Sequence, residues 1–365
     1  MRILSKYVLR EFLIPLTYCL VGFLGIYTIF ELFDSFNRII ENKPTLGETV
    51  SFFAGYISPY FEWLIPAALM LATLYTMWNF CRHSEITAMR ASGIGFSVIV
   101  RPILMVATLF AVIVAGINEF YAPWASEQAR DFKMNRFKTL DTKTFNQVVF
   151  YNLEAHRIWR VEKIHSATPG KLEGVRISFD RQDGSRKMDI SCEKAEYLDG
   201  MWWLFHPVYH YYDLQNNPIP SRKPQLDHLS LRACPDYDET PRDFLLMNKS
   251  WDYYSVRDMR HYLRRHPNLT PEERNNRIYD IHSRFAAPFS CLIITLFAIP
   301  AGVATSRQSV FKGVIGAVGM FFGFYALSIG CMILAKNSLI PAIPAAWCAN
   351  TIFLVIGLIL FHKQR

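Results

Sequence analysis

The segment RHSEITAMRASGIGF, residues 82–96, places charged residues between two strongly apolar stretches. Ser84 is a favoured N-cap residue, and Glu85 would fall in the first helical turn, where its negative charge complements the helix dipole. Gly93 is a natural residue for ending the helix. The spacing therefore predicts a capped helix of about two turns between two apolar segments.

The same short helix carries Ile86, Met89 and Arg90 on one side, because residues three and four apart are neighbours on a helix surface. An acid, a base and two apolar side chains on so small a helix are suited to docking rather than catalysis. A helix of fewer than ~12 residues is marginal in water, so it needs a surface to pack on. The residue types leave two surfaces open: the ends of this chain's own helices, or a partner protein.

Other residues that could do chemistry form weaker patterns. His206 and His210 share one face of an expected strand, but no Cys or carboxylate at metal-ligand spacing accompanies them, so partly buried structural histidines are favoured over a metal site. Cys192 and Cys234 are the two cysteines outside the apolar stretches, and a disulfide between them stays open, because sequence spacing alone does not show proximity. We expect no metal and no cofactor.

Sequence motifs of enzymes and nucleotide-binding proteins are missing. The sequence contains no G-x-x-x-x-G-K-[ST], no H-E-x-x-H and no G-x-S-x-G. The apolar stretches also lack the paired acids or histidine chains of proton-coupled transport. Glu31 and Glu62 are the acids nearest to apolar segments, and both can be placed at a membrane interface.

Six windows are apolar enough to cross a bilayer, which requires ~20 residues. They cover residues 12–33, 63–80, 97–121, 281–303, 313–335 and 342–361. A polar block of roughly domain size, about 123–277, separates the third window from the fourth. The sequence therefore predicts three membrane helices, one soluble domain and three more membrane helices. Glycines at 313, 316, 319 and 323 predict close helix packing in the fifth window, against this chain or a second one.

Basic residues gather on one side of these windows, and such an excess marks the cytoplasmic side. They are Arg2, Lys6, Arg10, Arg82, Arg90, Arg101, Arg307, Lys312, Lys363 and Arg365. Both termini are therefore expected in the cytoplasm and the polar block outside. The net charge of +8 follows from this topology, and no basic stripe with interleaved aromatics points to nucleic acid.

The residue pattern of the polar block predicts mostly β-strands. Runs such as GVRISFD and MWWLFHPVYHYYDL are rich in Val, Ile, Phe, Tyr and Trp, and Asp183-Gly184 and Asp199-Gly200 separate consecutive runs as hairpin turns. Its last part turns helical, with Ser255 and Thr270 as expected N-caps.

Several stretches together resemble a known family. They are PYFEWLIPAALMLATLYTMWNFCRHSEITAMRASGIG (59–95), NEFYAPWASEQAR (118–130), SRFAAPFSCLIITLFAIPAG (283–302) and IPAAWCANTIFLVIGLIL (343–360). The chain resembles the LptF/LptG permeases of the lipopolysaccharide-export ABC transporter over the whole membrane portion, and AEYLDGMWWL resembles strands of their β-jellyroll. The segment 118–130 and the C-terminal window lean towards LptG.

The resemblance implies a fold, a location and partners. The fold is a polytopic α-helical membrane protein with six helices and a periplasmic β-jellyroll between the third and fourth. Residues 1–122 would hold three helices and the coupling helix 84–92, residues 123–277 the jellyroll with a helical return segment, and residues 278–365 the last three helices. The chain would lie in a Gram-negative inner membrane.

The implied function is a permease subunit without enzymatic activity, which extracts lipopolysaccharide and passes it to a periplasmic bridge. The implied partners are a cytoplasmic LptB-like ATPase dimer, a second permease and LptC/LptA-like jellyroll proteins. Glu85, Ile86, Met89 and Arg90 would contact the ATPase.

The resemblance also assigns substrate contacts. Arg38, Arg130 and Lys133 match basic residues that would meet lipid phosphates, with interfacial anchoring as the structural alternative. Glu31 stands where some LptG members carry a lysine, and an acid does not bind phosphate directly.

A different class of function remains open from the residues alone. A membrane-anchored envelope receptor or scaffold could share the same arrangement, with its outward β domain binding a ligand. Such a receptor would need no capped helix on the cytoplasmic side. An intramembrane enzyme is disfavoured by the lack of catalytic pairs.

Overall fold

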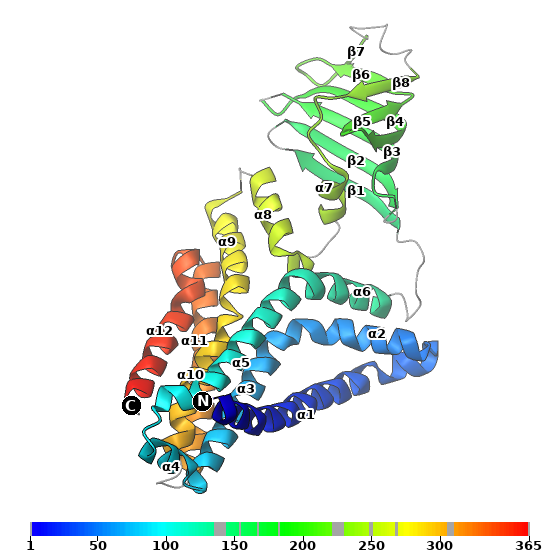
Figure 1. Ribbon diagram of the computed structural model, residues 1–365. Coiled ribbons are helices and arrows are strands. Elements are labelled where there is room, and N and C mark those ends of the chain that lie inside the picture. The colour runs from blue at the N-terminus through cyan, green and yellow to red at the C-terminus, as the bar shows by residue number, and fades with distance from the viewer. Residues whose placement is uncertain are drawn as a thin grey trace. The chain divides into compact units, whose positions relative to one another are not determined.

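The computed structural model describes residues 2–134, 144–152, 155–165, 168–181, 183–220, 230–247, 251–266, 269–304 and 310–363. The chain divides into two compact units. The helical unit comprises residues 1–138 and 269–365, and the β unit comprises residues 139–268. Figure 1 shows both units with the element labels that are used below.

The first half of the helical unit is built from long apolar helices joined by short ones. They are α1 (Arg2–Asn42), α2 (Leu46–Ile57), the 3₁₀ turn η1 (Ser58–Tyr60), α3 (Phe61–Arg82), α4 (Glu85–Ala91), α5 (Phe96–Gly116), the π-helix η2 (Ile117–Tyr121) and α6 (Ala122–Met134). With 41 residues, α1 is about 60 Å long, roughly twice the thickness of a hydrocarbon core.

The second half of the helical unit follows the β unit in the sequence. It contains α9 (Pro271–Ala286), α10 (Phe289–Ala304), α11 (Val310–Lys336) and α12 (Ala342–His362). Among the described residues, five helices are long and apolar enough to cross a membrane, and α9 with α10 forms a sixth candidate bent by 52°. The bend falls at Pro288, which has no N–H to continue the helix. The sequence predicted six apolar helices, and the structure supports five to six of them.

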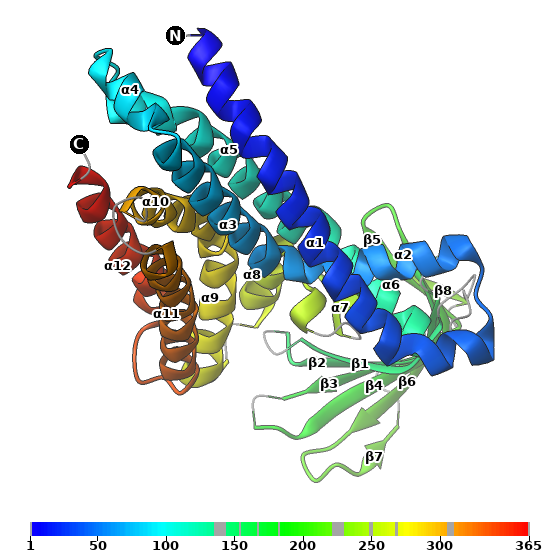
Figure 2. The same cartoon turned by 90° about the horizontal axis from the view of Figure 1, so that it is seen from below.

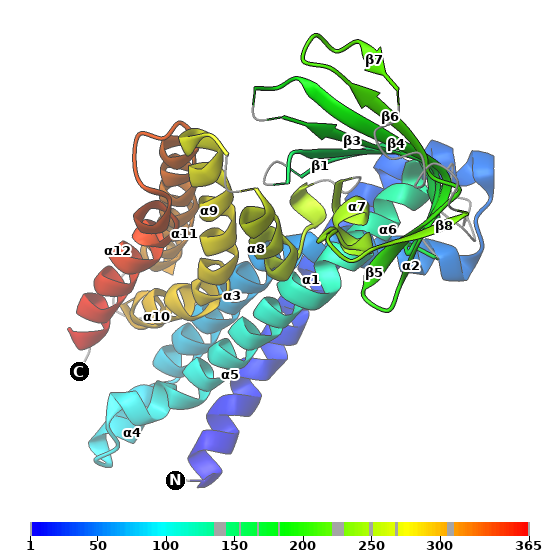
Figure 3. The ribbon, with the colours of Figure 1, turned by 90° about the horizontal axis from the view of Figure 1, so that it is seen from above.

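The core of the helical unit lies where α1, α3, α5 and α10 meet. On α1, Val8, Phe12 and Leu16 are fully or almost fully buried at every fourth position, so one face of the helix packs inward. Figures 2 and 3 show that α4, the start of α1 and the end of α12 lie at the same end of this helical bundle.

Three helices begin with reciprocal caps. Thr45 precedes α2 and bonds with Glu48, Ser255 precedes α8 (Val256–Arg265) and bonds with Asp258, and Thr270 precedes α9 and bonds with Glu273. In each pair the hydroxyl accepts from a backbone N–H while the carboxylate accepts from the cap's own N–H. The N-caps expected at Ser255 and Thr270 are confirmed.

The β unit is a single antiparallel sheet. Its strands are β1 (Thr144–Asn152), β2 (Arg157–His165), β3 (Lys171–Asp180), β4 (Arg186–Leu198), β5 (Met201–Phe205), β6 (Val208–Tyr212), β7 (Pro218–Ile219) and β8 (Leu231–Cys234). The order is β1-β2-β3-β4-β5-β8, and β6 pairs with the first part of β4 and with β7. Along the edge that does not pair with β3, the 13-residue β4 pairs first with β6 and then with β5.

The turn chemistry of the sheet follows the sequence. Asp199 and Gly200 join β4 to β5 with φ values of 53° and 81°, as a two-residue hairpin turn requires. Gly184, in the turn between β3 and β4, also has a positive φ. Trp159 and Trp202 are fully buried on the inner face, with ring centroids 5.5 Å apart. An antiparallel β domain between the membrane helices is confirmed.

Short helices close one end of the β unit. They are α7 (Pro241–Met247), the 3₁₀ turn η4 (Trp251–Tyr253) and α8. Phe244 on α7 is fully buried and its ring lies 5.3 Å from that of Phe150 on β1, so α7 completes the core of the sheet.

Candidate functional sites

The helix α4 has the expected end but not the expected beginning. Gly93, with φ of 82°, follows the helix, and its N–H donates to the Arg90 carbonyl while the Ile94 N–H donates to the Met89 carbonyl. These two bonds form a Schellman motif. Ser84 holds the N-cap position, but its φ is 56° and its side chain makes no capping bond. The prediction of a Ser84 side-chain cap is wrong, because the tight turn after α3 forces a left-handed backbone there.

Glu85 is held by α1. The Tyr7 hydroxyl lies 2.9 Å from Glu85 Oε2 and 3.1 Å from Oε1, so it donates to this carboxylate. The Tyr7 ring in turn lies 5.9 Å from the ring of Phe80 on α3. One hydroxyl therefore connects the first residue of α4 to the start of α1. Tyr7 and Glu85 are 78 positions apart, so no local sequence pattern could have paired them.

The two apolar residues of α4 face the chain's own core. Ile86 is 6% exposed and belongs to the main core of the helical unit, and Met89 packs against that core. Arg90 is exposed, as are Thr87 and Ala88. Ile86 and Met89 therefore anchor α4 on the helical unit. The exposed side of α4 is small and polar, and Glu85 lies at the edge of this exposed side.

Of the three basic residues expected at lipid phosphates, the structure describes only the backbone. Arg38 lies in the last turns of α1, and Arg130 and Lys133 lie in the second half of α6. Their side chains lie outside the described residues.

Glu31 points into the protein. It is 3% exposed, and its Oε1 accepts from the hydroxyl of Ser35 at 2.9 Å. Both residues continue the inward face of α1 that begins with Val8, Phe12 and Leu16. Because Glu31 faces inward, its carboxyl group does not lie on the open side of α1.

A second buried polar contact joins α3 to the π-helix η2. The Asn118 amide donates to Glu62 Oε2 at 3.3 Å, and the Tyr325 hydroxyl of α11 lies 3.4 Å from the Glu62 carbonyl oxygen. The Trp63 and Tyr325 rings stack with centroids 4.2 Å apart. The π-helix places Asn118 in register with Glu62, and such bulges are frequent at functional sites.

Open apolar faces lie on α1 and α11. The exposed apolar residues of α1 include Tyr18, Val21, Ile26, Phe30, Phe33 and Ile40. On α11, a Cβ added at Gly316 or Gly319 would meet nothing within 4 Å, whereas one at Gly323 would lie 3.5 Å from Phe353. The surroundings of Gly313 lie outside what the structure describes. The glycine face of α11 is therefore packed at Gly323 and open at Gly316 and Gly319.

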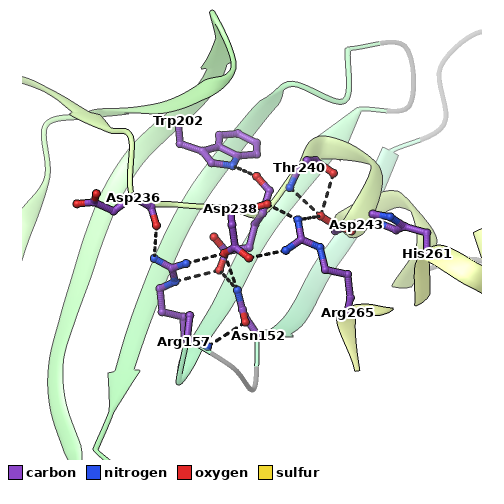
Figure 4. Close-up of polar contacts among 11 residues, drawn as sticks. Asn152, Arg157, Trp202, Asp236, Asp238, Thr240, Asp243, His261 and Arg265 are labelled. Carbon is purple, nitrogen blue, oxygen red and sulfur yellow. Dashed lines mark hydrogen bonds and ion pairs between the residues drawn. The ribbon is translucent and has the colours of Figure 1, made fainter. Parts of the chain in front are cut away.

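A dense polar cluster fastens the end of the β unit (Figure 4). Arg157, the first residue of β2, donates to Asp238 Oδ1 at 2.7 Å and to Glu239 Oε1 at 3.0 Å. Asn152 on β1 donates to the same two oxygens at 2.9 and 2.7 Å. The Trp202 indole donates to the Glu239 carbonyl oxygen at 2.7 Å.

The same cluster continues to α8. Arg265 bonds to Asp238, and His261 Nε2 lies 2.5 Å from Asp243 Oδ1. Burial alone would raise the pKa of Asp238, but the charge and hydrogen bond of Arg265 hold that pKa below its usual value. Asp238 and Glu239 each pair with an arginine, and Asp243 lies within ion-pair distance of Arg265, which indicates that the cluster is a structural clasp.

Cys192 and Cys234 are free, buried thiols in this structure. Burial, reinforced by the neighbouring Cys234, raises the pKa of Cys192 to about 12. The Nδ1 atom of His206 lies 3.9 Å from the carboxylate of Glu193. Among the described residues no group of three His, Cys, Asp or Glu side chains could hold a metal ion.

Apolar helices with an antiparallel sheet inserted between them define the chain as a polytopic membrane protein with a β domain. The family described as "Lipopolysaccharide export system permease LptF/LptG" matches residues 6–363, and the chain belongs to this family. A search of the curated proteins found no match. The family is one of inner-membrane, multi-pass permease subunits of the lipopolysaccharide export system.

Proposed function

We propose that this chain is a permease subunit that extracts lipopolysaccharide from the inner membrane and is driven by ATP hydrolysis in a separate cytoplasmic subunit. The observation that carries the proposal is α4, a short helix seated on its own membrane helices by Ile86 and Met89, which presents Glu85 and Arg90. The sequence has no phosphate-binding loop motif, which supports a separate subunit as the site of the nucleotide chemistry.

In this proposal α4 docks on a dimeric ATPase of the LptB kind. Arg90 and Glu85 offer one charge of each sign, and the Tyr7 hydroxyl fixes the orientation of the Glu85 carboxylate. Ile86 and Met89 pack α4 against α1, α3 and α5. Because this packing is tight, a movement of α4 is transmitted to these membrane helices.

The end of the helical bundle that carries α4 indicates which side of the membrane is cytoplasmic. The start of α1, the end of α12 and α4 lie at one end of the bundle (Figures 2 and 3), and the sequence carries Lys6, Arg82 and Arg90 in these segments or next to them. The positive-inside rule supports a cytoplasmic location for this end and a periplasmic location for the β unit. The proposed domains remain residues 1–122, 123–277 and 278–365.

The acyl chains of the lipid explain why its export needs an energy source and a route that is shielded from water. Each CH₂ moved into water costs ~0.8 kcal/mol, so several acyl chains cost roughly tens of kcal/mol. The open apolar faces of α1 and of α11 at Gly316 and Gly319 support a second permease and the acyl chains as their occupants. Arg38, Arg130 and Lys133 are the proposed phosphate contacts at the membrane, and jellyroll proteins of the LptC/LptA kind receive the lipid.

The test is affinity purification of the permease with its ATPase. We expect Glu85→Ala to leave the protein inserted in the membrane but to weaken ATPase binding by at least about tenfold. The matched control is Glu272→Ala, which removes an exposed acid from the first turn of α9. Equal recovery of the ATPase with both variants and the unmodified chain would refute docking through α4.

A further inference from the structure

Two cysteines meet where α11 packs on α12. Cys331 on α11 is 6% exposed, and Cys348 on α12 is half-buried. Both thiols are free, and the Cys331 thiol donates a hydrogen bond to the Cys348 sulfur. The contact therefore brings together the two groups from which a disulfide bond forms.

The hairpin of α11 and α12 places both cysteines at the same level. The rings of Phe324 on α11 and Phe353 on α12 have centroids 5.5 Å apart. From this contact, Cys331 lies about 10 Å and Cys348 about 8 Å nearer to the turn that joins the two helices. Cys331 also shares the face of Phe324, because it follows after about two helical turns. The helix register thus supports the pairing independently of the hydrogen bond.

Small residues allow the two helices to approach closely around the pair. Ala335, Ala342 and Ala345 are buried in one cluster with Cys331, and Tyr279 of α9 belongs to the same cluster. Cys348 packs against this cluster. Since alanines already fill the neighbouring positions, close packing alone does not require a thiol from each helix.

Cys348 is the more accessible member of the pair. Pro344 and Ile352, one helical turn before and after it, are both exposed. A small oxidant that enters the membrane can therefore reach Cys348 from outside the bundle, while Cys331 lies behind it. The turn next to the pair is at the end of the helical bundle opposite to α4 (Figure 1).

We propose that Cys331 and Cys348 are an oxidative modification site, at which a membrane-permeant two-electron oxidant converts the two thiols into a disulfide that fastens α11 to α12. Two S–H bonds break and one S–S bond forms. The two protons and two electrons pass to the oxidant; an azo compound takes them up at its N=N bond and becomes a hydrazine. This modification goes beyond the proposed export function and does not depend on it.

The test treats the full chain in membrane vesicles with the azo oxidant diamide, starting from reduced thiols. After remaining thiols are blocked and the chain is denatured, trypsin cleaves after Lys336, which lies between the two cysteines. A disulfide keeps the peptides 313–336 and 337–363 joined, and mass spectrometry measures this linked product. The matched control is Cys348→Ser with Ile356→Cys, which keeps the number of thiols but moves one of them about 12 Å along α12 to an exposed position.

We expect at least about tenfold more linked peptide from the unmodified chain than from the control, and its loss when dithiothreitol is added. Linked peptide no more abundant than in the control would overturn the modification site, whether Cys348 stays free or reacts with something else.

Hydrogen exchange of the same samples tests whether the disulfide fastens the helices. The Ser338 and Leu339 amides in the turn donate to the carbonyl oxygens of Ala335 and Leu334, each at 2.9 Å. Oxidation of the unmodified chain should slow the exchange of these amides at least about threefold, because a cross-link limits local opening, and should leave the control unchanged. Equal exchange before and after oxidation would overturn the fastening of α11 to α12.

Discussion

The Tyr7 hydroxyl donates to the Glu85 carboxylate, which joins the first turns of α1 to the first residue of α4. Glu85 is the residue that the family resemblance places at the ATPase, and α1 carries the longest open apolar face of the helical unit. A single hydrogen bond therefore links the proposed docking helix to a helix that is proposed to meet the lipid.

Tyr7→Phe tests whether this bond orients Glu85. Removing the hydroxyl leaves the Tyr7 ring beside Phe80 but takes a donor from the carboxylate. We expect ATPase affinity to fall about fivefold, in line with the ~1 kcal/mol net value of a hydrogen bond. Binding of the ATPase to the purified permease measures the effect.

A double-mutant cycle supplies the control for this prediction. In a Glu85→Ala background, Tyr7→Phe should cause no further loss, because its proposed partner is already absent. Additive losses from the two changes would show that Tyr7 acts independently of Glu85.

The contact between α2 and α6 predicts a stability difference between two glycines of the same helix. A Cβ at Gly55 would overlap the Ala125 carbonyl oxygen, whereas one at Gly47 would meet nothing within 4 Å. Gly55→Ala should destabilise the fold by about 1–3 kcal/mol, and Gly47→Ala should be neutral or slightly stabilising. Thermal unfolding of the full chain in detergent compares them, and equal midpoints would contradict the packing.

Lowering the pH should weaken the attachment of α8 to the rest of the β unit. Although burial opposes it, Arg265 holds the pKa of Asp238 below its usual value, and hydrogen bonds from Arg242 and Ser255 do the same for Asp258. A lowered folded-state pKa gives stability that is present above the unfolded value, ~3.9, and is lost as pH falls through the folded value.

Hydrogen exchange of the full chain between pH 6 and pH 3 measures this loss. After correction for intrinsic exchange, protection of α8 should decline below about pH 4. Asp238→Asn should reduce protection of α8 already at neutral pH and flatten its pH dependence. Protection of α8 that is constant down to pH 3 would contradict the role of the clasp.

Thiol reactivity tests the interior of the sheet. Burial, followed by the neighbouring Cys234, raises the pKa of Cys192 to about 12, and burial raises the pKa of Cys234 as well. At pH 8 and under reducing conditions, both should alkylate at least about a hundredfold more slowly than a cysteine at exposed position 198. Labelling of Cys192 at the rate of the exposed control would show that the sheet opens there.

The sequence predicted elements whose signals are local. Hydropathy located the apolar helices, Asp199-Gly200 located a hairpin, and Ser255 and Thr270 located two helix starts, because each signal depends on a few adjacent residues. The break at Pro288 was missed, since the apolar pattern continues across it and hydropathy does not detect a bend.

The candidate site was predictable only in part. The position of α4 and its stop at Gly93 follow from sequence, but the inward direction of Ile86 depends on how α4 packs on other helices. The Tyr7–Glu85 bond and the pairing of Arg157 with Glu239 join residues that are far apart in the chain. Such contacts are set by tertiary packing, which periodicity and spacing do not encode.

The most direct test of the central claim is a site-specific crosslink from α4. A photo-crosslinking residue at exposed Ala88 is compared with one at Leu339, in the turn at the opposite end of the bundle. The account predicts a crosslink from position 88 to an ATP-hydrolysing subunit in intact cells, and none from position 339. If position 88 gives no such product, or if only position 339 does, then α4 is not the contact through which ATP hydrolysis drives this permease.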